Sequence, residues 1–161
     1  MDLIYIGKLV NTHGIKGEVK IISDFKFKND VFNINNQIYI NNQKYIIKSY
    51  RRHKIYDMVT LNDFKSIDDV INLKGMDVYI DKNDYKFNGY LNEDLMGLDV
   101  YDNDEYKGKV IGIEKSNIYD LLVIDGKRRH LVPNIPEFVK NIDIDKKIIN
   151  IKYIRGLDLE D

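Results

Sequence analysis

Two prolines, the only ones in 161 residues, lie three positions apart in Leu131-Val132-Pro133-Asn134-Ile135-Pro136-Glu137-Phe138-Val139. Proline fixes φ and removes a backbone donor, so a strand that approaches this segment is expected to end at Pro133. Pro136 suits the first position of a short helical turn, where the missing N–H costs little. The stretch therefore predicts a rigid corner after a strand, with apolar residues available to anchor it.

Short runs rich in Ile, Val and Tyr extend outward from this corner in both directions, and turn residues separate them. Such runs indicate β-strands. In the C-terminal run, Ile149, Ile151 and Tyr153 alternate onto one face, as a half-buried strand requires. The expected strands cover residues 3–10, 18–23, 37–40, 44–47 extending to 54, 55–61, 76–80, 98–101, 109–113, 121–124, 129–132 and 148–154.

Two dipeptides predict tight hairpins. Asn41-Asn42 separates two β-type runs, and Asn tolerates the positive φ that such turns need. Asp125-Gly126 is a strong two-residue hairpin signal.

One helix is predicted from about residue 67 to residue 74. Ser66 can cap its N-terminus, Asp69 stands three residues later as in a capping box, and Gly75 can close it. After the next strand the chain becomes polar. The expected architecture is mainly β: two small β-barrel domains joined by a short linker, with one short helix in the first and a short helical turn in the second. The expected bounds are 1–82, a linker at 83–91, and 92–161.

The composition is that of a folded protein, with 43% hydrophobic and 32% charged residues. No Cys is present, which excludes disulfides, thiol catalysis and Cys-based zinc sites. No apolar run approaches the length of ~20 residues that a membrane span needs, and no signal-peptide pattern is visible, so a cytoplasmic protein is expected. The net charge of −1 implies that any RNA contact is local or depends on a protein partner.

No catalytic, metal or cofactor motif stands out, so we expect no enzyme and no cofactor. His13, His53 and His130 are far apart in sequence. The loop from Gly14 to Gly17 leads into a strand rather than a helix, which makes it a poor phosphate cradle. The stretch 103–114 resembles a calcium loop but carries Lys107 at a ligand position. A small hydrolase would have to use turn carboxylates, which are usually structural; the candidates are Asp94, Asp120 and Glu137.

Two basic clusters, at residues 50–54 and 127–130, are candidate RNA contacts. Arg binds phosphate in a bidentate manner and Tyr stacks on unpaired bases. Solvated strand edges that block edge-to-edge pairing would show the same charges. Because strand faces alternate, neighbouring Arg51 and Arg52 cannot both point the same way. The candidate RNA contacts are Lys16, Arg51, Arg52, Lys54, Arg128 and Arg129.

The first half of the chain contains three motifs that bear on its family: Ile6-Gly7-Lys8-Leu9-Val10-Asn11-Thr12-His13-Gly14-Ile15-Lys16-Gly17-Glu18-Val19, Ser23-Asp24-Phe25 and Leu73-Lys74-Gly75. The second half contains Asp94-Leu95-Met96-Gly97-Leu98, Gly108-Lys109-Val110, Tyr119-Asp120-Leu121-Leu122-Val123, the proline corner and Gly156-Leu157. In these motifs and in their order, the chain resembles the RimM family of ribosome maturation factors over nearly its whole length, and its second half resembles the PRC barrel of that family.

The resemblance implies a cytoplasmic, monomeric assembly factor without a membrane partner. Its partners would be the immature small ribosomal subunit with its rRNA, and a ribosomal protein of the subunit head. It would assist 16S rRNA folding and processing. The family's tyrosine pair reads Tyr90-Leu91 here, and with Leu95 these are the implied docking candidates. The alternative is a PRC-barrel adaptor without a ribosomal role.

Overall fold

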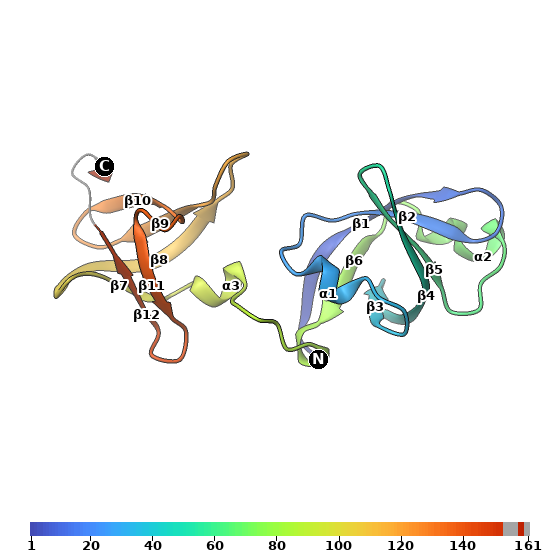
Figure 1. The fold of residues 1–161 in the computed structure, drawn as a ribbon, viewed down its shortest axis with the longest axis horizontal. Helices are drawn as coiled ribbons and strands as arrows, with labels where there is room; N and C mark the ends of the chain where they lie inside the picture. The colour runs from blue at the N-terminus through green and yellow to red at the C-terminus, as the bar shows by residue number, and fades with distance from the viewer. Residues whose placement is uncertain (153–157, 160–161) are drawn as a thin grey trace. The chain divides into compact units, whose positions relative to one another are not determined.

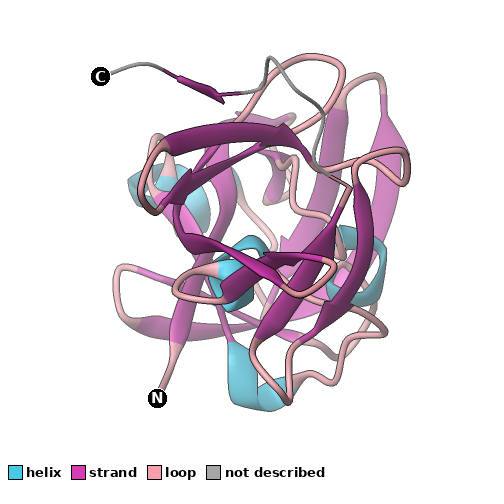
Figure 2. Cartoon of the chain, turned by 90° about the vertical axis from the view of Figure 1, so that its left-hand side faces the viewer, coloured by secondary structure: helices cyan, strands magenta, loops and turns pink. Residues whose placement is uncertain are grey.

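A computed structural model of the chain describes residues 1–152 and 158–159. The chain divides into two compact units, Met1–Asn88 and Gly89–Asp161. Figures 1 and 2 show that strands dominate both units and that the helices are single short turns. The prediction of a mainly β protein with two β domains is confirmed.

The first domain is a closed barrel in the order β1-β2-β5-β4-β3-β6. Its strands are β1 (Leu3–His13), β2 (Glu18–Ile22), β3 (Gln37–Ile40), β4 (Gln43–His53), β5 (Tyr56–Leu61) and β6 (Asp77–Asp81). Closure protects the sheet edges within residues 1–88, because β1 pairs with both β2 and β6. The alternating apolar residues of these strands fill the interior, for example Ile6, Leu9 and Val19.

The Asn41-Asn42 hairpin is confirmed. Both residues have positive φ, at 52° and 62°, and they join β3 directly to β4. Asn adopts this left-handed conformation more readily than other non-glycine residues. The turn thereby sets the register, in which Ile40 lies opposite Gln43.

The helix predicted over residues 67–74 ends one residue earlier in the structure and consists of two short helices. Helix α2 (Ile67–Val70) tightens into the 3₁₀ helix η1 (Ile71–Leu73). The Asp69 carboxylate accepts hydrogen bonds from the backbone N–H groups of Lys65 at 3.1 Å and Ser66 at 3.2 Å, which lower the pKa of Asp69. The predicted capping box is therefore present. The domain also contains α1 (Lys28–Val31) and the 3₁₀ helix η2 (Lys82–Asp84).

The second domain is a seven-stranded sheet in the order β11-β12-β7-β8-β9-β10-β13. Helix α3 (Asn92–Leu95) precedes it. Its strands are β7 (Asp99–Asp102), β8 (Glu105–Glu114), β9 (Leu121–Asp125), β10 (Arg129–Pro133), β11 (Val139–Asp143), β12 (Ile148–Ile151) and β13 (Asp158–Leu159). One core cluster underlies the sheet and includes Val100, Leu122 and Ile149. Of the predicted C-terminal strand, Tyr153 lies outside the described residues, as do Gly156 and Leu157 of the family resemblance.

The proline corner forms as predicted. Strand β10 ends at Pro133. The Ile135 carbonyl then accepts hydrogen bonds from the N–H groups of Phe138 at 3.0 Å and Val139 at 2.9 Å, which makes one helical turn that starts at Pro136. Phe138 and Val139 pack against the second core.

The aromatic residues within the stretch 83–91 are divided between the hydrophobic cores of the two domains. Tyr85 and Phe87 pack against the first core, and their rings stack with centroids 5.4 Å apart. Tyr90 packs against the second core.

Candidate functional site

The two domains carry opposite net charge. Residues 1–88 hold 14 Lys and Arg against 11 Asp and Glu, a net charge of +3. Residues 89–161 hold 11 Lys and Arg against 15 Asp and Glu, a net charge of −4. The overall charge of −1 therefore conceals a basic domain followed by an acidic one.

One group of charged side chains in the first barrel joins residues that are distant in sequence. The imidazole of His13, at the end of β1, lies beside that of His53, at the end of β4, with ring centroids 5.8 Å apart. Glu18 lies opposite His13 in the sheet, and Arg51 donates to both of its carboxylate oxygens, at 2.8 and 2.7 Å. We call the group His13, Glu18, Lys20, Arg51, His53 and Lys54 the His13–His53 cluster.

The charges of this cluster act on one another. Hydrogen bonds from Arg51 lower the pKa of Glu18, so this carboxylate stays ionised. Partial desolvation lowers the pKa of His53, and the positive charges of Arg51 and Lys54 lower it further. The surroundings of His53 therefore disfavour its protonated form.

A second charged network joins side chains of α1, β4 and β5 around Asp57. The Asp57 carboxylate is buried and accepts hydrogen bonds from Lys28 Nζ at 3.1 Å and Tyr50 Oη at 2.7 Å. Arg52 Nη1 lies 3.6 Å from the same carboxylate. Burial, together with the Asp57 hydrogen bond, raises the pKa of Tyr50 to about 12, so its hydroxyl remains a donor.

The predicted RNA contacts divide between the domains. Arg51 and Arg52 are each paired with a carboxylate, and their side chains remain half exposed. Lys54 lies in the exposed turn after β4, where its φ is 56°. Lys16 is exposed in the loop between β1 and β2. The pair Arg128 and Arg129 is exposed on the second domain, around the start of β10.

The predicted docking residues are mostly internal. Leu95 is fully buried and Leu91 is 6% exposed. Leu95 is a core residue, which leaves its side chain no surface for a partner. Tyr90 is half buried and its hydroxyl accepts a hydrogen bond from Asn134 Nδ2 at 3.2 Å. Only Tyr90 of the three presents a polar group and part of a ring at the surface.

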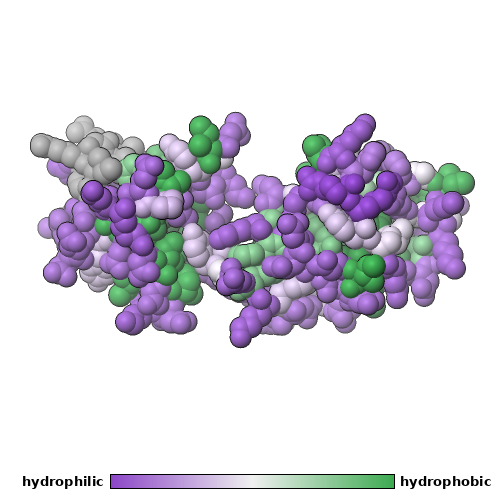
Figure 3. All heavy atoms as spheres, in the orientation of Figure 1, coloured by the Kyte–Doolittle hydropathy of each residue, from purple (hydrophilic) through white to green (hydrophobic). Residues whose placement is uncertain are grey.

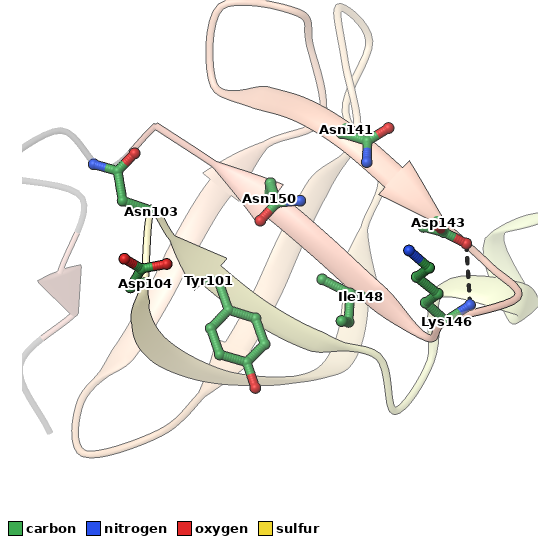
Figure 4. A pocket seen from close by; sticks show the side chains of 8 residues that line it. All are labelled: Tyr101, Asn103, Asp104, Asn141, Asp143, Lys146, Ile148 and Asn150. Carbon is green, nitrogen blue, oxygen red and sulfur yellow. Dashed lines mark hydrogen bonds between the residues drawn. The ribbon is translucent and has the colours of Figure 1, made fainter.

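A polar groove of about 350 Å³ crosses β7, β12 and β11 of the second domain (Figure 4). Asp143 lies at one end, where its carboxylate accepts a hydrogen bond from the Lys146 N–H at 3.0 Å. No local sequence pattern predicts this groove, because its residues come from three separate segments. They are Tyr101, Asn103, Asp104, Asn141, Asp143, Lys146, Ile148 and Asn150.

The visible face of each domain is mainly hydrophilic, and apolar side chains form small groups on it (Figure 3). Across residues 1–152 and 158–159, no three His, Asp or Glu side chains are placed to hold a metal ion. No helix among the described residues combines the length and apolar character of a membrane span.

A closed β-barrel followed by a second β domain of opposite charge defines a two-domain β protein with a candidate polar surface on each domain. The family profile of the RimM N-terminal domain matches residues 4–85, and that of the RimM PRC barrel domain matches residues 92–157. The chain belongs to the RimM family.

Its relatives match over nearly their full length. Proteins named ribosome maturation factor RimM are 35% identical in Staphylococcus haemolyticus, with 96% of this chain and 98% of the relative covered, and 36% identical in Ligilactobacillus salivarius, with 98% and 100% covered. A RimM protein from Pseudomonas aeruginosa, known from a crystal structure, is 21% identical in sequence, and the two structures superpose with a TM-score of 0.46. The match covers 95% of this chain and 98% of the Pseudomonas chain. The RimM N-terminal domain from Thermus thermophilus is 19% identical, with a TM-score of 0.46, covering 54% of this chain and 98% of its own.

Proposed function

We propose that this protein is a maturation factor of the small ribosomal subunit, which binds the immature subunit through a ribosomal protein of its head and assists 16S rRNA folding and processing. The observation that carries the proposal is the match of both domains, in order, to relatives named ribosome maturation factor RimM. We further propose that it acts in the cytoplasm as a monomer and catalyses no reaction.

The opposite charges of the two domains support a division of labour. Proteins that bind rRNA carry a basic excess, because phosphate neutralisation drives their affinity. An acidic domain of net charge −4 is complementary to such a protein and repels RNA. We therefore propose that the second domain docks the ribosomal protein, with Tyr90 and the polar groove as candidate contacts, and that the basic first domain faces rRNA.

Sedimentation of cell extracts in sucrose gradients tests this proposal. The protein is expected with free small subunits and their precursors, and not with translating ribosomes. Crosslinking of the purified protein to small subunits should then identify a head protein joined to the second domain. A protein found in neither free small subunits nor their precursors would instead fit an adaptor without a ribosomal role.

The salt dependence of subunit binding separates the two sets of candidate RNA contacts. The double variant Lys16→Gln/Lys54→Gln is expected to flatten the plot of log K against log salt by about 0.7 for each lysine that binds a phosphate in the unaltered protein. These lysines are preferred to Arg51 and Arg52, because removing Arg51 would take from Glu18 its hydrogen-bonded cation, and removing Arg52 would take from Asp57 one of its two cations.

The matched control is the double variant Arg128→Gln/Arg129→Gln, which removes the same charge from the second domain. Its slope is expected to equal that of the unaltered protein. A slope that falls in this control instead would place the RNA on the second domain. Two unchanged slopes would show that none of these four side chains binds a phosphate, as expected for the solvated charges of strand edges and loops.

A further inference from the structure

The His13–His53 cluster has more positive than negative groups, and it contains two imidazoles, the side chain that titrates nearest to neutral pH. Four segments supply it: β1 gives His13, β2 gives Glu18 and Lys20, β4 gives Arg51 and His53, and the following turn gives Lys54. Lys20 lies over the Tyr56 ring, 4.9 Å from its centroid. Lys20, Arg51 and Lys54 outweigh the single carboxylate of Glu18 without any contribution from the imidazoles.

We propose that the His13–His53 cluster binds a phosphodiester group of RNA and takes up a proton as it does so. The inference rests on the proposed function, because it assumes that the first domain faces rRNA. To the proposed function, the inference adds a defined RNA contact and a dependence of RNA affinity on pH. Arg51 holds Glu18 with two hydrogen bonds, so this carboxylate is engaged by the guanidinium group rather than by an imidazole.

The physical reason is the mutual repulsion within the cluster. His53 faces Arg51 and Lys54 on its own hairpin, His13 from β1 and Lys20 from β2, with Glu18 as the opposing charge. A proton on His53 is therefore disfavoured in the free protein. A phosphodiester anion beside the rings favours the charged imidazole, as any opposite charge within ~4–6 Å does.

RNA affinity is expected to rise as pH falls, because the complex binds more protons than the free protein. The rise occurs between the pKa of His53 in the complex and its lower pKa in the free protein. Each proton taken up in full changes the affinity tenfold per pH unit, and we expect the binding of RNA to tighten about fivefold or more from pH 7.5 to pH 6.0. Below that range both states are protonated and the dependence disappears.

Filter binding of the full chain to end-labelled oligouridine, from pH 5.5 to pH 8.0 at constant salt, tests the inference. The phosphodiesters of this probe keep their charge over the whole range. The double variant His13→Gln/His53→Gln is expected to give a flat profile at the weaker, high-pH affinity. His53→Lys carries a permanent charge at the same place, and it should give a flatter profile than the unaltered protein with an affinity near its low-pH value.

Circular dichroism at each pH confirms that each variant is folded, and small-subunit sedimentation at pH 7.5 is measured on the same preparations. A flat profile in the unaltered protein, or a profile that survives in the double glutamine variant, would overturn the inference. If the protein still sediments with small subunits in that case, the proposed function stands without it. Failure to bind both RNA and subunits would overturn both.

Discussion

Replacing Asp57 with alanine should lower the free energy of unfolding of the first domain by about 3–5 kcal/mol, the usual cost of removing one partner from a buried ion pair. The Asp57 side chain is 1% exposed, and it accepts hydrogen bonds from Lys28 Nζ and Tyr50 Oη. Without the carboxylate, a partly buried ammonium group loses its counter-charge and a partly buried phenol loses its acceptor. The half-exposed Arg52 loses less, since water can solvate it.

Native-state amide hydrogen exchange followed by NMR is the appropriate measurement, because a two-domain chain need not unfold in one step. Protection should fall in the first domain and remain unchanged in the second. Asp63→Ala, at an exposed aspartate of the same domain, is the matched control and should change stability by no more than about 0.5 kcal/mol. Equal losses in the two variants would show that the Asp57 network contributes nothing specific.

The second large effect is expected from Gly108→Ala, which should destabilise the second domain by about 3 kcal/mol or more. Gly108 has φ +133°, a conformation that residues with a side chain rarely adopt. A Cβ at this position would also overlap the backbone of Asp125, with Gly126 N only 2.7 Å away. Strands β8 and β9 approach so closely here that backbone atoms would have to move.

The matched control is Gly97→Ala in the same domain. Gly97 also has a positive φ, +80°, but a Cβ there would meet nothing within 4 Å. Its cost is the backbone strain alone, about 1–2 kcal/mol. Hydrogen exchange of β8 and β9 should distinguish the two variants, and losses of the same size would mean that the close approach of the strands has no energetic consequence.

Gly126 shows where local sequence patterns mislead. The Asp125-Gly126 pair predicts a two-residue hairpin turn, and a hairpin between β9 and β10 does exist. The two-residue turn is wrong, however, because Asp125 is the last residue of β9 and the loop covers residues 126–128. A Cβ on Gly126 would overlap the Lys107 carbonyl. A glycine is needed here because the backbone of β8 lies so close, and a dipeptide pattern carries no information about that contact between strands.

Two further differences between the sequence-based predictions and the structure also arise from contacts between segments that are distant in sequence. Local patterns do not predict strand β11, because Val139-Lys140-Asn141-Ile142-Asp143 lacks a run of β-branched residues. It forms as a strand because β12 pairs with it. The family motif implies Leu95 as a docking residue, but burial of its side chain in the second core leaves no surface for a direct contact.

The elements that depend on local chemistry can be predicted from the sequence alone. Alternating apolar residues specify most strands, Asn41-Asn42 specifies a hairpin, Ser66 and Asp69 specify a capped helix, and Pro133 ends a strand. These signals are local because backbone conformation and side-chain alternation act over a few residues. The ordered motifs of the two halves are also sufficient for the family.

Which charges meet, in contrast, depends on the tertiary structure. His13 and His53 are forty positions apart, and barrel closure places their rings 5.8 Å from each other beside Arg51 and Glu18. Asp57 is one of many aspartates in the sequence. It differs from an ordinary surface aspartate because its side chain is buried and accepts hydrogen bonds from Lys28 and Tyr50. Electrostatic interactions depend on distance and burial, and both are set by strand pairing between remote segments.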